Sequence, residues 1–348
     1  MKKQIYLFLT ALMVLLCSCD PHEWPKLSTT DLYVDLVFDF SDIPLFKEIT
    51  ISHDSYQSRG SQQRQAIASP QMRYVLRCYA LSADSVNYEL MPQSQFIFTN
   101  DDLQDPNYRC RITLVPGQYK IKVWADYVEH GSKDDMFYNT YNFNDIFLTG
   151  NTNDYVGSTE LRDAFIGEQE VVVEHSPDMA MPSNVSAHIM MERPFAKFKF
   201  ITTDIPDFVG KYLGISDPEK IKDVDFSDYR VLFRYTGYLP THFNMFTDKP
   251  FDAGQGYQFF STISEPTATE ATLGYDYVFV NGRESSVSVA VGIYDREGTL
   301  LSFSNPVEVP LKRNHVTVVR DKFLSQGGHG NVGINPEYEG SYTIFYYE

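Results

Sequence analysis

The stretch RCRITLVPGQYKIKVWADYV, residues 109–128, holds two runs of alternating apolar and polar residues joined by a proline and a glycine. Alternation with a period of two is typical of β-strands that bury one face. Pro116 fixes its own φ and Gly117 tolerates a positive φ, so the pair is typical of a turn. The stretch therefore predicts two consecutive strands, 109–115 and 118–128.

Runs of the same kind continue through the chain. Five apolar residues alternate with other residues in 31–40, namely Leu32, Val34, Leu36, Phe38 and Phe40. We predict further strands at 72–81, 95–100, 186–192, 196–203, 229–237, 241–247, 257–263, 275–282, 286–295, 307–311, 315–319 and 342–348. Many short strands separated by turn residues favour β-sandwiches over an α/β fold. One helix is expected, at 204–213 with Asp204 as its N-cap.

The length of 348 residues suggests two domains. A stretch without periodicity, EHSPDMAMPSN, places the boundary near residue 180, with an N-terminal β-sandwich over 31–180 and a C-terminal one over 181–348. Residues 129–165 are rich in Asn, Asp and Tyr, and we interpret them as an elaborated crossover. Residues 52–70 are polar and unpatterned, which predicts a long loop.

The N-terminus has the pattern of an export signal. Lys2 and Lys3 precede an apolar run, residues 5–16, which is too short to span a bilayer and fits the core of a signal peptide. Residues 1–18 are therefore expected to be a lipoprotein signal peptide. A simple secretory signal followed by incidental cysteines is the alternative.

Cys19 has the neighbours that a bacterial lipoprotein signal peptidase requires, with small Ser18 before it and aliphatic Leu16 three places before it. Cys17 follows a bulky leucine and lacks them. We therefore expect Cys19 to carry the lipid. Several acyl chains on this residue would give firm anchoring. Residues 19–30 would then tether the fold to the outer membrane, facing the periplasm or the cell surface.

The chain is acidic, with 46 Asp and Glu against 29 Lys and Arg and a formal net charge of −17. Such a surface repels nucleic acid and anionic headgroups, so neither is expected as a partner. The hydrophobic share of 43%, with 24 Tyr and 25 Phe, is enough to fill substantial cores.

Beyond the signal region only Cys78 and Cys110 remain, each in a stretch that alternates like a strand. Each shares a face with apolar neighbours, so both sulfurs should point into a core. The export route is oxidising, which allows a disulfide between them. Two buried free thiols are the alternative.

No motif predicts catalysis, a metal or a cofactor. GHGNVG, residues 328–333, matches a dinucleotide fingerprint, but Pro336 follows where a helix should begin, so a glycine-rich loop is favoured. Residues 151–163 faintly resemble a calcium loop, but the glycine comes one place late and Arg162 stands in the twelfth place, so an acidic loop is favoured. The eight histidines show no ligand spacing.

Trp124 raises the question of glycan recognition, because flat rings stack on sugar faces. If Tyr119, Ile121 and Val123 face inward, then Trp124 faces outward, and an exposed tryptophan is unusual. The alternative is that segment 129–165 covers it.

Several stretches together resemble fimbrillin-like lipoproteins of Bacteroidales, a family similar to fimbrium anchor and accessory subunits. They are LVPGQYKIKVWADYV, RPFAKFKF, YRVLFRYTGYLPTHFNMFTDKP and LKRNHVTVVRDKFLS. Two landmarks are clearest, one formed by Arg193, Pro194, Ala196 and Lys197, and the other by Lys312, Arg313, Asn314 and His315. These motifs are structural landmarks rather than signatures of an active site.

The resemblance implies an all-β chain of two tandem transthyretin-like Greek-key β-sandwiches with a short helix in the second, without catalysis or a cofactor. It also implies assembly by strand complementation with other subunits. Stalk subunits in such systems are cut by a protease after the first strand, and Arg59 and Arg64 lie in a comparable place. Anchors need no cut, and an ordinary solvated loop is the alternative.

These observations predict a non-enzymatic, lipid-anchored cell-envelope protein that is an anchor, tip or accessory subunit of a fimbria-like assembly. The alternative is a surface glycan-binding lipoprotein of a polysaccharide-uptake system. An unpaired edge strand or a groove would favour assembly, whereas an exposed platform of two or three aromatic residues would favour glycan binding. The C-terminal SYTIFYYE, residues 341–348, is the candidate edge strand.

Overall fold

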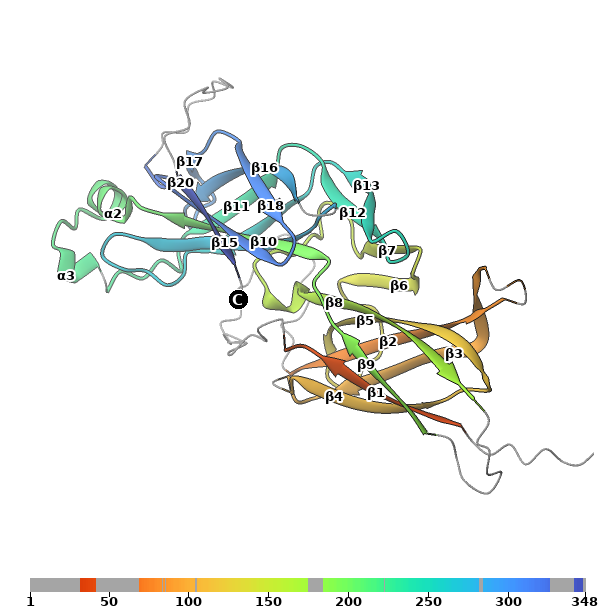
Figure 1. Ribbon diagram of the computed structural model, residues 1–348. Helices are drawn as coiled ribbons and strands as arrows, with labels where there is room; N and C mark the ends of the chain where they lie inside the picture. The colour runs from red at the N-terminus through yellow and green to blue at the C-terminus, as the bar shows by residue number, and fades with distance from the viewer. Residues whose placement is uncertain are drawn as a thin grey trace, which may run out of the picture.

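A computed structural model describes residues 32–41, 69–325 and 341–346, apart from 83, 85, 104, 175–183, 222, 282 and 283. Two β-sandwiches lie side by side, and a small sheet joins them (Figure 1). The predicted all-β fold class is confirmed. No helix among the described residues is both long and apolar enough to cross a membrane.

The first sandwich packs a three-stranded sheet, in the order β4-β1-β9, against a four-stranded sheet, in the order β3-β2-β5-β8. Its strands are β1 (Tyr33–Asp39), β2 (Pro70–Leu81), β3 (Tyr88–Asn100), β4 (Asn107–Thr113), β5 (Gly117–Glu129), β8 (Ala164–Val173) and β9 (Asn184–Met190). The apolar residues predicted to alternate in 31–40 are all buried between these sheets. β1 pairs antiparallel with β4 and parallel with β9 along its whole length.

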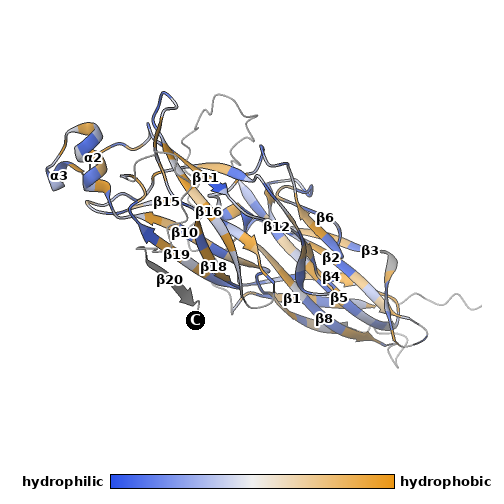
Figure 2. Cartoon of the chain, turned by 90° about the horizontal axis from the view of Figure 1, so that it is seen from above, coloured by the Kyte–Doolittle hydropathy of each residue, from blue (hydrophilic) through white to orange (hydrophobic). Residues whose placement is uncertain are grey.

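The second sandwich packs the sheet β15-β10-β19-β20 against the sheet β14-β11-β16-β17, in which β18 also pairs with β16. Its strands are β10 (Phe195–Thr202), β11 (Arg230–Tyr235), β14 (Gln258–Thr262), β15 (Ala271–Phe279), β16 (Glu284–Tyr294), β17 (Leu300–Phe303), β18 (Val307–Lys312), β19 (His315–Asp321) and β20 (Ser341–Tyr346). Figure 2 shows apolar and polar residues alternating along many of these strands, as sheets with one buried face require.

A third sheet connects the two sandwiches, in the order β13-β12-β7-β6. Its strands are β6 (Tyr138–Asn142), β7 (Asp145–Leu148), β12 (Leu239–Asn244) and β13 (Lys249–Gly254). β7 pairs with β12, so the stretch read as a crossover contributes two strands to a sheet completed by the second half of the chain. We call it the bridging sheet.

Helix α2 (Ile205–Leu213) confirms the predicted helix, and the shorter α3 (Pro218–Ile221) and a 3-10 turn, η1 (Glu160–Arg162), were not predicted. Both α-helices lie at the end of the second sandwich that is far from the first (Figure 1). Asp204 occupies the N-cap position, but its side chain does not cap α2. It accepts instead from the backbone N–H of Leu324 at 3.3 Å and of Ser325 at 2.6 Å, so it fixes the chain after β19.

Strand pairing moves the division between the halves away from residue 180. β9, expected in the second domain, completes the first sandwich beside β1. The second sandwich begins after Arg193, with β10. The turn at Pro116–Gly117 also differs from a hairpin, because β4 and β5 belong to facing sheets. The φ of Gly117 lies outside the left-handed region, and an added Cβ would lie 3.2 Å from the Tyr119 hydroxyl, so a larger residue fits only if the Tyr119 ring shifts by a few tenths of an ångström.

Candidate functional site

The two sequence landmarks meet where the sandwiches join. The guanidinium of Arg193 donates to Asn314 Oδ1 at 3.1 Å, and the Asn314 backbone N–H donates to the Phe195 carbonyl at 2.8 Å. Arg313 Nε donates to the Arg193 carbonyl at 2.6 Å and its terminal nitrogens bind Asp248. The start of the second sandwich is therefore tied to the turn between β18 and β19.

Arg193 also reaches back to the first half of the chain. Its Nε lies 2.9 and 2.8 Å from the two carboxylate oxygens of Asp163, and both side chains are buried. Burial raises the pKa of Asp163 to about 6, although the nearby Arg193 cation opposes this shift. Beside this pair, Glu160 binds Lys197 at 2.5 Å and accepts from the Tyr277 hydroxyl. We call this set the junction clamp.

A second buried group lies deeper in the joint. The hydroxyls of Tyr155 and Tyr235 each donate to Asp276 Oδ2 at 2.7 Å, and Arg162 Nε lies 3.4 Å from Asp276 Oδ1. Burial raises the pKa of both tyrosines well above its ordinary value, so their hydroxyls keep the protons they donate. The Tyr138 hydroxyl donates to the Arg162 carbonyl. This group connects the chain around residues 138–162 to β11 and β15.

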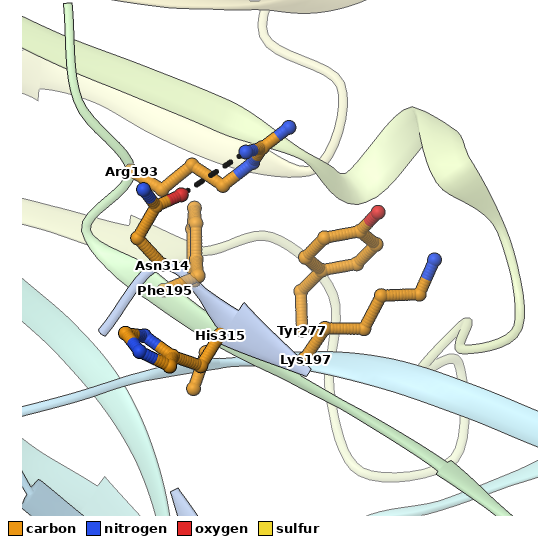
Figure 3. A pocket seen from close by; sticks show the side chains of 7 residues that line it. Arg193, Phe195, Lys197, Tyr277, Asn314 and His315 are labelled. Carbon is orange, nitrogen blue, oxygen red and sulfur yellow. Dashed lines mark hydrogen bonds between the residues drawn. The ribbon is translucent and has the colours of Figure 1, made fainter. Parts of the chain in front are cut away.

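A shallow crevice opens beside the clamp (Figure 3). It is lined by Arg193, Phe195, Ala196, Lys197, Tyr277, Asn314 and His315. Figure 3 shows Tyr277 and Lys197 side by side, opposite the Arg193–Asn314 pair. The crevice has room for about one water molecule and is too small for a substrate.

Trp124 is wholly buried, so the prediction of a surface aromatic is wrong. Its ring packs against Tyr138 at 5.2 Å and Phe195 at 6.4 Å between ring centroids, and its Nε1–H donates to Asp126 at 3.1 Å. The covering residues come partly from segment 129–165, as the alternative proposed. The outer face of β5 is buried here because the bridging sheet and the second sandwich lie on it.

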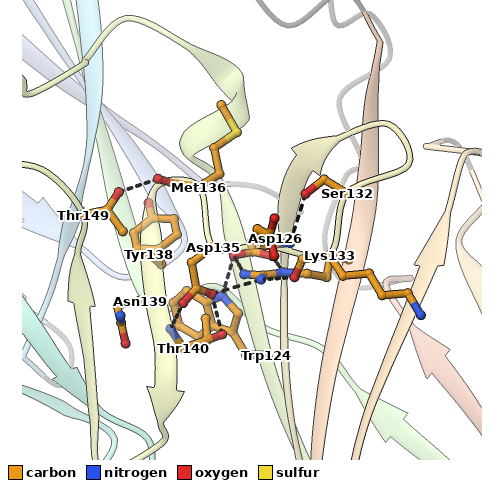
Figure 4. A network of polar contacts seen from close by, with 12 residues as sticks. Trp124, Asp126, Ser132, Lys133, Asp135, Met136, Tyr138, Asn139, Thr140 and Thr149 are labelled. Atoms are coloured by element: carbon orange, nitrogen blue, oxygen red, sulfur yellow. Dashed lines mark hydrogen bonds and ion pairs between the residues drawn. The ribbon is translucent and has the colours of Figure 1, made fainter. Parts of the chain in front are cut away.

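Asp126 anchors a polar network on the same face (Figure 4). Arg73 donates from Nε and Nη2 to its two carboxylate oxygens, at 2.8 and 2.7 Å. Arg73 Nη1 also donates to Asp135 Oδ1 at 3.0 Å and to the Lys133 carbonyl at 2.9 Å. A bidentate pair with this many partners fixes the start of segment 129–165 against β2 and β5.

Cys78 and Cys110 are free thiols in the structure, so the possible disulfide between them is not formed and the alternative of two free thiols is observed. Cys78 is buried and Cys110 is half-buried, and both contribute to the first core as predicted. β2 and β4 belong to facing sheets of the first sandwich. Burial raises the pKa of both thiols to about 12.

The remaining predicted sites fall outside the described residues: Cys19, Arg59, Arg64 and the glycine-rich 328–333. Segment 151–163 is described, and it supplies Tyr155, Glu160, Arg162 and Asp163 to the joint rather than a calcium loop. The residues that the structure describes contain no group of three or more His, Cys, Asp or Glu able to hold a metal ion.

The buried ionisable residues of the joint were not predicted. A signal was present, because Arg73 and Asp126 interrupt strands whose neighbours are apolar, and such residues require buried partners. The buried ionisable residues of the joint can hold the two sandwiches in one orientation. Breaking one partner of such a pair leaves an uncompensated buried charge, at a cost of about 3–5 kcal/mol.

The strands and the joint define an all-β protein of two sandwiches fastened by buried ion pairs. The profile of a family of unknown function, DUF6562, matches residues 36–346, and the chain belongs to this family. No protein with a curated description matches the sequence.

Three solved structures are similar in outline. A candidate cell adhesion protein from Bacteroides eggerthii DSM 20697 is 11% identical, with a TM-score of 0.44 over 90% of this chain and 95% of that one. A candidate polysaccharide-binding protein from Bacteroides thetaiotaomicron VPI-5482 is 11% identical, with a TM-score of 0.42 over 78% and 80%. The fimbrial anchor protein Mfa2 from Porphyromonas gingivalis is 8% identical, with a TM-score of 0.38 over 83% and 90%. These likenesses are loose, and the fold assigned above rests on this chain's own strand pairing.

Proposed function

We propose that this protein is a non-enzymatic, lipid-anchored cell-envelope subunit, an anchor, tip or accessory component of a fimbria-like assembly. Lipid on Cys19 would hold it at the outer membrane. The observation that carries the proposal is the position of β20. This terminal strand pairs antiparallel with β19 from His315↔Tyr346 to Arg320↔Ser341, and among the described strands none pairs with its other edge.

An open strand edge presents backbone N–H and C=O groups that a strand from another subunit can use. Natural proteins usually blunt such an edge with charge or proline, but SYTIFYYE has no proline and its one acid is the final residue. An edge left open in this way supports strand addition by a partner.

The first sandwich supports the role of an uncut subunit. β1 is the central strand of its sheet, and five buried apolar side chains of residues 32–40 fill the core beneath it. Its loss by cleavage at Arg59 or Arg64 would open a slot between β4 and β9. An anchor or accessory subunit keeps this strand, so we propose that the chain stays intact there.

The test adds a charge to the edge. Thr343→Lys should leave the melting temperature unchanged within a few degrees and abolish co-purification of partner subunits after cross-linking in the native envelope, because an edge lysine discourages strand addition. Thr269→Lys, an exposed residue outside any strand, is the matched control. Partners retained by both variants would refute assembly through β20.

Deleting residues 341–348 gives an independent measure. Loss of partners at an unchanged melting temperature identifies β20 as a strand offered to a neighbour. An insoluble or strongly destabilised protein shows instead that β20 is needed to close its own sheet. If neither folding nor association changes, β20 has no part in assembly.

A further inference from the structure

The outward face of the bridging sheet carries a row of aromatic rings. Phe251, His242 and Phe147 lie on the consecutive strands β13, β12 and β7. The ring centroids of Phe147 and His242 are 5.3 Å apart, and those of His242 and Phe251 are 5.5 Å apart. Ile146 and Phe243, which alternate with the row, are buried on the opposite face. The row therefore lies on the side of the sheet turned away from the core, and we call it the aromatic row.

Exposed aromatic residues concentrate at this sheet. The described residues include five aromatic side chains with large exposed fractions, and four of them belong to the bridging sheet or the turns beside its strands: Tyr141, Tyr238, Phe246 and Phe251. Phe246 packs on Tyr79 of the first sandwich. Tyr141 is 84% exposed and Phe251 is 56% exposed, in a chain that buries most of its other rings. Clustered exposure of this kind marks a binding surface.

The backbone at Tyr141 is fixed by a β-bulge and by hydrogen bonds from an arginine. The register of β6 against β7 shifts between Asn139 and Asn142, so Tyr141 lies in a β-bulge. The buried Arg77 donates from Nη2 to the Thr140 carbonyl at 3.3 Å and to the Tyr141 carbonyl. A bulge redirects a side chain, and here a cation from the first sandwich fixes it.

Polar side chains border the rings. His242 Nδ1 donates to Asp145 at 2.7 Å, which fixes the ring in the row. Amide side chains lie on or beside the same strands, at Asn139, Asn142, Asn144 and Asn244. The Asp145 carboxylate is already engaged by His242, and the exposed Lys249 and Asp252 of β13 carry opposite charges. The surface around the row therefore offers amide donors and no strong net charge. This composition does not favour an anionic or cationic ligand.

We propose that the aromatic row and Tyr141 bind a neutral oligosaccharide. The apolar C–H face of a pyranose ring stacks on an exposed aromatic ring, and asparagine amides recognise the hydroxyl groups around it. The aromatic row is three rings wide on a four-stranded sheet. A stable protein interface buries about 800 Å² per partner around an apolar centre. The row is therefore better matched in size to a sugar chain than to a protein partner. This ligand goes beyond the proposed assembly role and does not depend on it.

The test titrates detergent-solubilised full-length protein with cellohexaose, mannohexaose, xylohexaose, maltohexaose and the neutral fraction of released mucin O-glycans, by calorimetry. At least one should bind, and Phe251→Ala and Tyr141→Ala should each weaken it about tenfold, since a lost ring contact is worth about 1.4 kcal/mol. Both side chains are exposed, so the fold should tolerate their loss. Phe260→Ala is the matched control, because Phe260 is an exposed phenylalanine on β14, away from the row.

Three outcomes overturn the proposal. No measurable binding of any of these glycans removes it. Binding that persists in Phe251→Ala and Tyr141→Ala places the sugar elsewhere. Loss of cross-linked protein partners from these two variants, with no sugar bound by the unmodified protein, identifies the row as a protein interface. The assembly role is judged separately by Thr343→Lys, which leaves the row intact.

Discussion

Truncating Trp124 tests whether the outer face of β5 is a core. Trp124 is fully buried, so Trp124→Ala leaves a cavity among the rings of Tyr138 and Phe195. Removing a buried tryptophan side chain costs about 3–5 kcal/mol. The indole N–H bond to Asp126 adds about 1 kcal/mol, since Arg73 keeps that carboxylate paired. We therefore expect a loss of about 4–6 kcal/mol, a large part of the stability of an ordinary domain.

The assay is urea denaturation followed by far-UV circular dichroism, which does not depend on the tryptophan itself. Tyr141→Ala is the control, because an 84% exposed side chain should change the free energy of unfolding by no more than about 0.5 kcal/mol. If Trp124→Ala costs less than about 1 kcal/mol, Trp124 is not enclosed, and the packing of the bridging sheet and second sandwich on β5 is refuted.

Three further predictions concern single groups. Burial raises the pKa of Asp163 to about 6, so the folded state binds this proton more tightly than the unfolded state. Stability should therefore fall as the pH rises from about 4 to about 7, and Asp163→Asn should flatten that profile in urea titrations. Alkylation in denaturant without reductant should modify both Cys78 and Cys110, and a mass two hydrogens lower with no adduct would contradict the free thiols. Cys19→Ser should abolish labelling by a fatty-acid probe, and persistent label would refute Cys19 as the lipid acceptor.

Periodicity predicted the strands because a strand with one buried face has apolar residues at every second position. It could not show whether the opposite face is covered by a distant part of the chain. Lys122, Trp124 and Asp126 have the alternation of an exposed face, yet all three are buried by the joint. Trp124 was a possible surface aromatic for that reason, and the structure shows instead the cover by segment 129–165 that was weighed against it.

Pairing between distant strands could not be predicted from the sequence either. The boundary near residue 180 followed local composition, whereas the parallel pairing of β9 with β1 depends on contacts about 150 residues apart in the chain. The landmarks around Arg193 and Asn314 were noticed, but their contact with each other was not predicted. The aromatic row was also missed, because Phe147 and Phe251 are about 100 residues apart and become neighbours only through β7 and β12.

The pairing of β1 has a mechanical consequence. Tension on the chain that enters at Leu32 runs along the axis of β1, which is bonded on one side to β4 and on the other to β9 over seven residues. Such a load acts on both ladders in shear, so many hydrogen bonds must fail together instead of opening one at a time. A chain pulled from its N-terminal side would resist at this strand first, with its side chains packed in the core beneath. Tethered pulling would then show one high rupture force rather than a gradual peeling.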